Sequence, residues 1–124
     1  MIRGLGVDME QVSRLKRSME NPRFLEKCFT PSEREYILSK ANAAQSAAGI
    51  FCAKEAFFKA MGVGIGAFSL HDMEIRHDRN GKPFMELYGH AKEMLKDGDV
   101  LVSIAHTGDL ATAQVLIVEK QSCF

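Results

Sequence analysis

The stretch AAQSAAGIFCAKEAFFKAM, residues 43–61, predicts one long helix, because it is rich in strong helix formers and is followed by Gly62 at the change to GVGIG. Apolar side chains are expected on almost every side of this helix, a pattern typical of a buried helix. Lys54, Glu55 and Lys59 nevertheless fall within two turns of it. Because an unpaired charge is costly to bury, these side chains require an ion, a ligand or a solvated cleft.

Upstream of this helix, alternating residue types predict a strand over residues 2–8, and a helical pattern follows over 10–28. The pair Asn21-Pro22 breaks that pattern, because the residue before a proline is pushed out of helical geometry. A further helix is predicted over 30–40, which begins with the spacing of a capping box and a proline at the first helical position. The amino-terminal third is therefore one strand followed by short helices.

Downstream of the helix, the pattern changes to short strands joined by turns. The sequence predicts a first hairpin of strands over 72–78 and 83–88, with its turn at 80–81, and then a short helix over 89–96. It predicts a second hairpin of strands over 100–107 and 110–119, with its turn at 108–109. The fold class is therefore α+β, with a long central helix packed on a mainly antiparallel sheet. We expect a single domain over 1–120 and a C-terminal tail over 121–124.

Length and composition exclude several classes of protein. A chain of 124 residues with 46% hydrophobic and 26% charged residues is typical of one soluble globular domain. It contains neither an apolar run of the about 18–20 residues that cross a bilayer nor a signal-peptide pattern, which predicts a cytoplasmic protein. A net charge of +0 argues against nucleic acid or an anionic membrane as partner. Cys28, Cys52 and Cys123 are interpreted as thiols.

The charged residues also allow simpler interpretations. Glu55 and Lys59, four residues apart, have the spacing of a surface ion pair worth about 0.3–0.5 kcal/mol, although their aromatic neighbours argue against a surface position. Asp8, at the end of the predicted strand, has the position of a helix cap. Gly4 and Gly6 share its predicted face, where small residues would leave space for a ligand.

Four segments together resemble one family: GVDME at 6–10, FCAKEAFFKAMGVGIG at 51–66, NGKP at 80–83 and SIAHT at 103–107. Their order and spacing resemble the holo-acyl-carrier-protein synthases, a family of 4′-phosphopantetheinyl transferases. The resemblance implies the 4′-phosphopantetheinyl transferase fold and transfer of the phosphopantetheine arm of coenzyme A to a serine of apo acyl carrier protein. Adenosine 3′,5′-bisphosphate is the second product, and the reaction supports fatty acid biosynthesis. A magnesium-dependent homotrimer with active sites between subunits is also implied.

The resemblance assigns catalytic roles to three residues. Asp8 and Glu55 match the family's metal ligands, and Mg²⁺ accepts one or two carboxylates together with phosphate oxygens and water. Lys59 matches a lysine that neutralises charge or protonates the leaving phosphate. Lys54 matches a lysine that either binds phosphate or holds the local ion network. In such a reaction the carrier serine would be deprotonated by Glu55 or by a metal-bound water, and the sequence does not choose between the two.

Further residues carry binding roles by resemblance. His106 and Thr107 match a pair near the phosphates of coenzyme A, although a lone histidine at a strand end is more often structural. Gly62 opens the glycine-rich stretch that lines the family's cofactor cleft. The region 11–28 carries an excess of basic residues, and Arg14 and Arg17 are our predicted contacts to an acidic acyl carrier protein.

One position departs from the family pattern. Many members carry an arginine where this chain has Ile50, and Lys40 or a neighbouring subunit would have to replace it as a phosphate contact. The first alternative function is therefore a coenzyme A-binding module that has lost transfer activity, which the presence of Glu55 and Lys59 argues against. The second alternative is an oligomerisation or regulatory domain, which does not explain Asp8.

Overall fold

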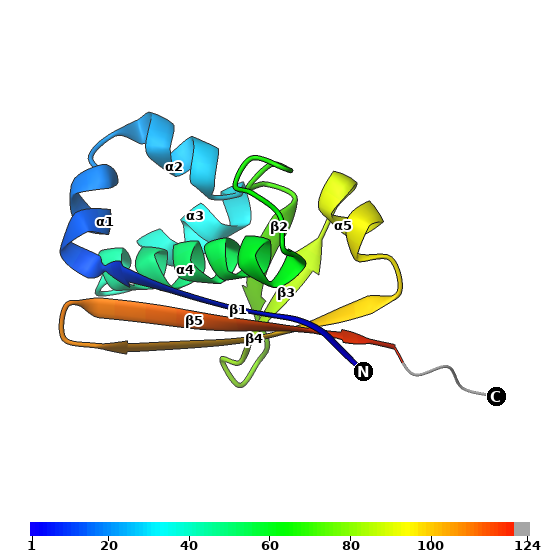
Figure 1. The fold of residues 1–124 in the computed structure, drawn as a ribbon. Coiled ribbons are helices and arrows are strands. Elements are labelled where there is room, and N and C mark those ends of the chain that lie inside the picture. The colour runs from blue at the N-terminus through cyan, green and yellow to red at the C-terminus, as the bar shows by residue number, and fades with distance from the viewer. Residues whose placement is uncertain (121–124) are drawn as a thin grey trace.

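The structure is a computed structural model that describes residues 1–120; the predicted tail over 121–124 lies outside the described residues. Its main sheet has three antiparallel strands in the order β1-β5-β4 (Figure 1). The strands are β1 (Ile2–Gln11), β4 (Gly98–Thr107) and β5 (Leu110–Glu119). The predicted α+β class with a mainly antiparallel sheet is confirmed.

The long helix α4 (Ala43–Met61) lies across one face of this sheet, against β1 and β5 (Figure 1). It begins at Asn42, whose side chain accepts a hydrogen bond from the Gln45 N–H, and ends at Gly62, which has a φ of 71°. Both ends agree with the sequence prediction, because an asparagine cap and a left-handed glycine are local signals.

Gly4 and Gly6 face α4. A Cβ atom at Gly4 would lie 1.9 Å from the Ala60 carbonyl oxygen, and one at Gly6 would lie 2.0 Å from the Ala56 carbonyl oxygen. The backbone of the helix therefore fills the space that we expected these glycines to leave for a ligand, and that expectation is wrong. Their function is to let β1 approach α4 closely.

Three short helices precede α4: α1 (Val12–Ser18), α2 (Pro22–Cys28) and α3 (Pro31–Leu38). The break at Asn21-Pro22 is confirmed, and so is the capping box of Thr30 and Glu33. The predicted helical start at residue 10 is wrong, because β1 continues to Gln11 by pairing with β5 as far as Leu110. Pairing between distant segments here overrides the local helical pattern.

A second sheet consists of the hairpin β2 (Met73–His77) and β3 (Pro83–Leu87), followed by the helix α5 (Gly89–Leu95). Helix α5 lies at the end of the molecule opposite α1 (Figure 1). The core forms two clusters along α4, one toward α1 and α3 and one toward α5. Cys28 and Cys52 are buried free thiols, whereas Cys123 lies outside the described residues. Among residues 1–120, none of the helices has both the length and the hydropathy needed to cross a bilayer.

Candidate active site

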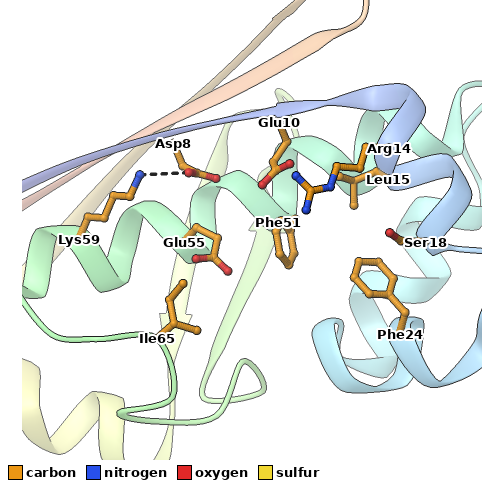
Figure 2. A pocket seen from close by; sticks show the side chains of 10 residues that line it. All are labelled: Asp8, Glu10, Arg14, Leu15, Ser18, Phe24, Phe51, Glu55, Lys59 and Ile65. Carbon is orange, nitrogen blue, oxygen red and sulfur yellow. Dashed lines mark hydrogen bonds and ion pairs between the residues drawn. The ribbon is translucent and has the colours of Figure 1, made fainter.

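A cleft of about 410 Å³ opens between β1, α1, α4 and the loop that follows α4 (Figure 2). Five charged side chains line it: Asp8, Glu10, Arg14, Glu55 and Lys59. The same cleft has apolar walls formed by Phe24, Phe51 and Ile65. The structure thus brings together all three predicted catalytic residues and one of the two arginines predicted to bind the carrier protein.

Asp8 and Lys59 form an ion pair between β1 and α4. Lys59 Nζ donates to Asp8 Oδ1 over 3.1 Å and to the Val7 carbonyl oxygen over 3.0 Å. The Lys59 side chain remains 55% exposed, whereas that of Asp8 is only 14% exposed. The simple interpretation of Lys59 as the surface partner of Glu55 is therefore wrong. Asp8 is also not a helix cap, because it lies within β1.

The second carboxylate oxygen of Asp8 is exceptional. Oδ2 is buried and has no hydrogen-bond partner among the described residues. A buried carboxylate oxygen without a partner is unfavourable unless a cation or another donor satisfies it. Asp8 lines the same cleft as Glu55, so the two carboxylates together fit a hard divalent cation.

The number of acids sets the kind of cation site. Within residues 1–120, no group of three or more histidine, cysteine, aspartate or glutamate side chains has metal-binding geometry. A complete protein cage, as calcium often has, is therefore not built here. Mg²⁺ requires less from the protein, because it keeps several waters and takes one or two carboxylates together with substrate phosphates.

Glu10 belongs to the same cleft, and the sequence analysis missed it. Its assignment to a helix concealed that Asp8 and Glu10, two residues apart on a strand, point to the same face. Burial raises the pKa of the Glu55 carboxyl, and the nearby charges of Asp8 and Glu10 raise it further. Burial likewise raises the pKa of Glu10, with a second contribution from Asp8. The cleft is therefore a site of unbalanced negative charge, which favours a cation.

Lys54 points away from the cleft and is fully buried. Its ammonium group donates to Glu33 Oε1 at 2.5 Å, to the Cys28 carbonyl oxygen at 2.7 Å and to the Leu70 carbonyl oxygen at 2.8 Å. Burial lowers the pKa of Lys54, and the Glu33 carboxylate opposes this effect. With all three N–H groups engaged, no donor remains for a phosphate, so the predicted phosphate contact of Lys54 is wrong. The structure instead agrees with the alternative prediction, in which Lys54 belongs to a local ion network.

Glu33 is the centre of that network. Beyond its capping bond with the Thr30 N–H, it accepts a hydrogen bond from the Ile75 N–H at 2.7 Å. Thr30 Oγ1 in turn donates to Glu74 Oε2 at 2.6 Å. The network joins α3, α4, β2 and the loop after α4, and it holds the loop that supplies one wall of the cleft. Only the capping role of Glu33 had a signal in the sequence.

The predicted coenzyme A contacts lie elsewhere in the chain. His106 is exposed near the end of β4 and lines a separate hollow of about 250 Å³, together with Ile50 and His77. Thr107 is exposed beside it, and neither residue lines the Asp8 cleft. Gly62 ends α4 and lines neither hollow. Within one chain, the acidic residues of the cleft and the predicted coenzyme A contacts His106 and Thr107 therefore lie at separate places.

The two predicted carrier contacts differ in position. Arg14 on α1 reaches into the cleft, where its guanidinium group lies beside Glu10 (Figure 2). Arg17, one turn further along α1, is exposed and lies outside the cleft. Helix α1 therefore connects the cleft to the open surface.

A buried carboxylate oxygen without a partner, a second carboxylate and two cationic side chains around one cleft are typical of enzymes that act on phosphorylated substrates with a divalent cation. Residues 4–113 match the family model described as the 4′-phosphopantetheinyl transferase superfamily, and the chain belongs to this superfamily.

Similar proteins carry a more specific name. The chain is 44% identical to the holo-[acyl-carrier-protein] synthase of Geotalea daltonii, covering 97% of this chain and 100% of that protein. It is 42% identical to the same-named protein of Treponema denticola, covering 94% and 98%. A holo-(acyl-carrier-protein) synthase of Bacillus anthracis, solved in complex with CoA (3′,5′-ADP), superposes with a TM-score of 0.84 at 32% identity, covering 97% of this chain and 99% of that one.

Proposed function

We propose that this protein transfers the 4′-phosphopantetheine arm of coenzyme A to a serine of apo acyl carrier protein. The products are holo acyl carrier protein and adenosine 3′,5′-bisphosphate, and the reaction serves fatty acid biosynthesis. The observation that carries the proposal is the cleft that Asp8, Glu55 and Lys59 line together, in which Lys59 pairs with Asp8 Oδ1 and Asp8 Oδ2 has no hydrogen-bond partner among residues 1–120. The names of the similar proteins support the same activity.

Asp8 and Glu55 would hold Mg²⁺ in this cleft. The ion, when bound, supplies positive charge to the diphosphate of coenzyme A. The rest of the protein's contribution is positioning and charge stabilisation, because phosphoryl transfer requires little covalent chemistry from side chains. Phe24 and Phe51 form an apolar wall beside these acids.

Lys59 is placed to stabilise the leaving group. Its ammonium group lies at the mouth of the cleft and is only partly engaged by Asp8 and the Val7 carbonyl. A half-exposed lysine can turn toward an incoming phosphate without leaving a buried charge behind. Lys59 would neutralise charge on the departing bisphosphate, or donate a proton from Nζ to it.

An acidic acyl carrier protein would dock on α1. Arg14 projects from this helix into the cleft, and Arg17 extends the positive charge over the exposed surface. Charge complementarity of this kind speeds encounter and fixes orientation. The carrier serine would thereby be brought to the same cleft as Asp8 and Glu55.

The outer face of the main sheet supports a homotrimer. Leu5, Val7 and Met9 on β1 are 66%, 50% and 61% exposed, and Leu101 on β4 is 53% exposed. The pairing register aligns Leu5 and Leu101 with Leu116 of β5 between them. A continuous apolar face of this kind is typical of an interface. Further copies of the chain on this face would bring a second subunit's nucleotide contacts toward each cleft.

Within this trimer we assign coenzyme A binding to the hollow that His106 lines. Ile50 gives that hollow no charge where many family members have arginine. Lys40 lies with Nζ 4.7 Å from the ring centroid of Tyr36, which lines the same hollow. A cation at the rim supports the replacement of the missing arginine by Lys40, and so supports a functional transferase over an inactive binding module.

We place this reaction in the cytoplasm. Cys28 and Cys52 are buried thiols, which suit a reducing compartment. Separation of cell extracts into cytosolic and membrane fractions tests this assignment, and a protein recovered only with membranes contradicts it.

The decisive experiment is incubation with Mg²⁺, coenzyme A and an apo acyl carrier protein, followed by mass spectrometry of the carrier. We expect a gain of one phosphopantetheine group on the carrier, and no gain when Mg²⁺ is chelated. The absence of any gain with several carriers would reject the transferase. If coenzyme A still binds in that case, the inactive binding module is selected.

A further inference from the structure

Helix α1 begins without a cap of its own. Gln11 occupies the N-cap position, and within residues 1–120 its side chain makes no capping hydrogen bond. The first turn of α1 also contains no acidic residue. A helix of only seven residues that starts in this way depends on outside partners for its first N–H groups.

Asp109 supplies those partners from the opposite end of the chain. Its carbonyl oxygen accepts a hydrogen bond from the Val12 N–H at 2.8 Å. Its carboxylate accepts two more from Ser13, from the backbone N–H to Oδ1 at 2.9 Å and from Oγ to Oδ2 at 2.6 Å. Both carboxylate oxygens are therefore engaged with the start of α1, which also benefits from negative charge there.

The two elements that Asp109 joins both carry predicted binding residues. Arg14 directly follows Ser13 and reaches into the cleft. Asp109 itself lies in the turn between β4 and β5, next to Gly108 with a φ of 55° and shortly after His106. Since β5 pairs with β1 as far as Gln11, the turn is a rigid support for the start of α1.

We infer that Asp109 is a positioning residue for carrier docking: it holds the first turn of α1 so that Arg14 faces both the cleft and an acidic partner protein. This inference rests on the proposed function. Without the carboxylate, the first turn of α1 frays and Arg14 is no longer held in a single orientation. Binding of the carrier would then weaken, while Asp8, Glu55 and Lys59 keep their positions.

The sign of the effect separates this role from simple electrostatics. Asp109 is negative, so its charge alone repels an acidic carrier. If only charge mattered, Asp109→Ala would lower the KM for the carrier. If Asp109 acts by holding α1, the same substitution raises that KM. Asp109→Asn loses the charge but keeps an oxygen for the Ser13 N–H, because asparagine is also a good helix cap.

The experiment compares four variants by steady-state kinetics with Mg²⁺, coenzyme A and the apo carrier protein. We expect Asp109→Ala to raise the KM for the carrier about fivefold, the factor that corresponds to a lost cap of typical strength. Asp109→Asn and Ser13→Ala should produce smaller increases, with kcat and the KM for coenzyme A unchanged in all three. Asp99→Ala is the control, because Asp99 is an exposed acid on β4. Within residues 1–120 its only ion pair is with Lys120, and the distance between Lys120 Nζ and Asp99 Oδ1 is 4.0 Å.

A second measurement does not depend on transfer. Amide hydrogen exchange over α1 should accelerate in Asp109→Ala and remain unchanged in Asp99→Ala. An unchanged or lower KM for the carrier in Asp109→Ala overturns the inference, and so does unchanged exchange over α1. If the wild type transfers nothing, the proposed function fails and the docking role fails with it, while the exchange data still decide whether Asp109 caps α1.

Discussion

Lys59 on α4 donates a hydrogen bond to Asp8 on β1 through Oδ1, while Asp8 Oδ2 stays buried without a partner among the described residues. One oxygen of this carboxylate is thus engaged, and the other has no hydrogen-bond partner. The ion pair holds the aspartate in a fixed orientation beside the cleft that Glu55 also lines.

Asp8→Asn should abolish magnesium-dependent transfer, because the amide removes the charge that the cation requires. We expect kcat to fall by about 10²-fold or more. Thermal unfolding should change little, since the lost ion pair has a half-exposed partner. Magnesium titration by calorimetry measures the binding directly. Near-normal turnover, or unchanged magnesium affinity, would show that the metal site lies elsewhere; Asp99→Asn is the matched control.

Lys59→Met should lower kcat by about 10²-fold, in the range typical of a lost proton donor. The KM for the carrier protein should remain close to that of the wild type, because α1 is not altered. Lys59→Arg keeps the charge and should recover part of the rate. Stopped-assay kinetics of the three proteins provide the comparison. If Lys59→Met retains the full kcat, the role in leaving-group stabilisation is excluded.

Lys54→Met should destabilise the protein by about 3–5 kcal/mol, because it leaves the Glu33 carboxylate buried without its counter-ion. Glu33→Gln should be similarly harmful. The double variant Lys54→Met/Glu33→Gln should recover part of the loss, since it removes both charges together while the glutamine keeps an oxygen for the Ile75 N–H. Urea unfolding measures each free energy. A cost below about 1 kcal/mol for both single variants would contradict the buried network.

His77 gives stability a dependence on pH. Burial, with a contribution from Lys40, lowers the pKa of His77 from its usual value of 6.5. At pH values between the pKa of His77 in the folded protein and its pKa in the unfolded chain, the unfolded chain binds more protons. The free energy of unfolding therefore decreases as the pH is lowered below about 6.5. His77→Phe keeps the stacking on Tyr36, whose ring lies 4.1 Å away, but cannot titrate. Urea unfolding at pH 5 and pH 7 should show a smaller difference in the variant, and equal differences would refute the assignment.

Leu5→Glu should disrupt the proposed trimer, because it places a charge in the centre of the apolar sheet face. The monomer should still fold, since Leu5 is already 66% exposed in the single chain. Light scattering after gel filtration measures the molecular mass, and transfer should fall together with assembly. Leu38→Glu, at an equally exposed site on α3, is the control. A wild-type monomer at all concentrations would reject the trimer.

Local signals were sufficient for most of the secondary structure. The capping box at Thr30, the break before Pro22 and the glycine after α4 depend only on neighbours in the sequence, and each lies where it was predicted. The end of β1 was not predictable in this way. Strand pairing with β5 extends β1 to Gln11, and Glu10 thereby joins Asp8 on the same face.

The sequence by itself determined the α+β class and the long helix, because helix and strand signals are local properties, and its resemblance to a known family pointed to Asp8, Glu55 and Lys59. Only the tertiary structure decided which lysine of α4 is buried in an ion pair and which one lines the cleft. Lys54 and Lys59 lie five residues apart on the same helix, yet the first is enclosed by acceptors from three distant segments and the second reaches the cleft. The cost of burying a charge depends on partners brought together by folding, and that information is absent from any short stretch of sequence.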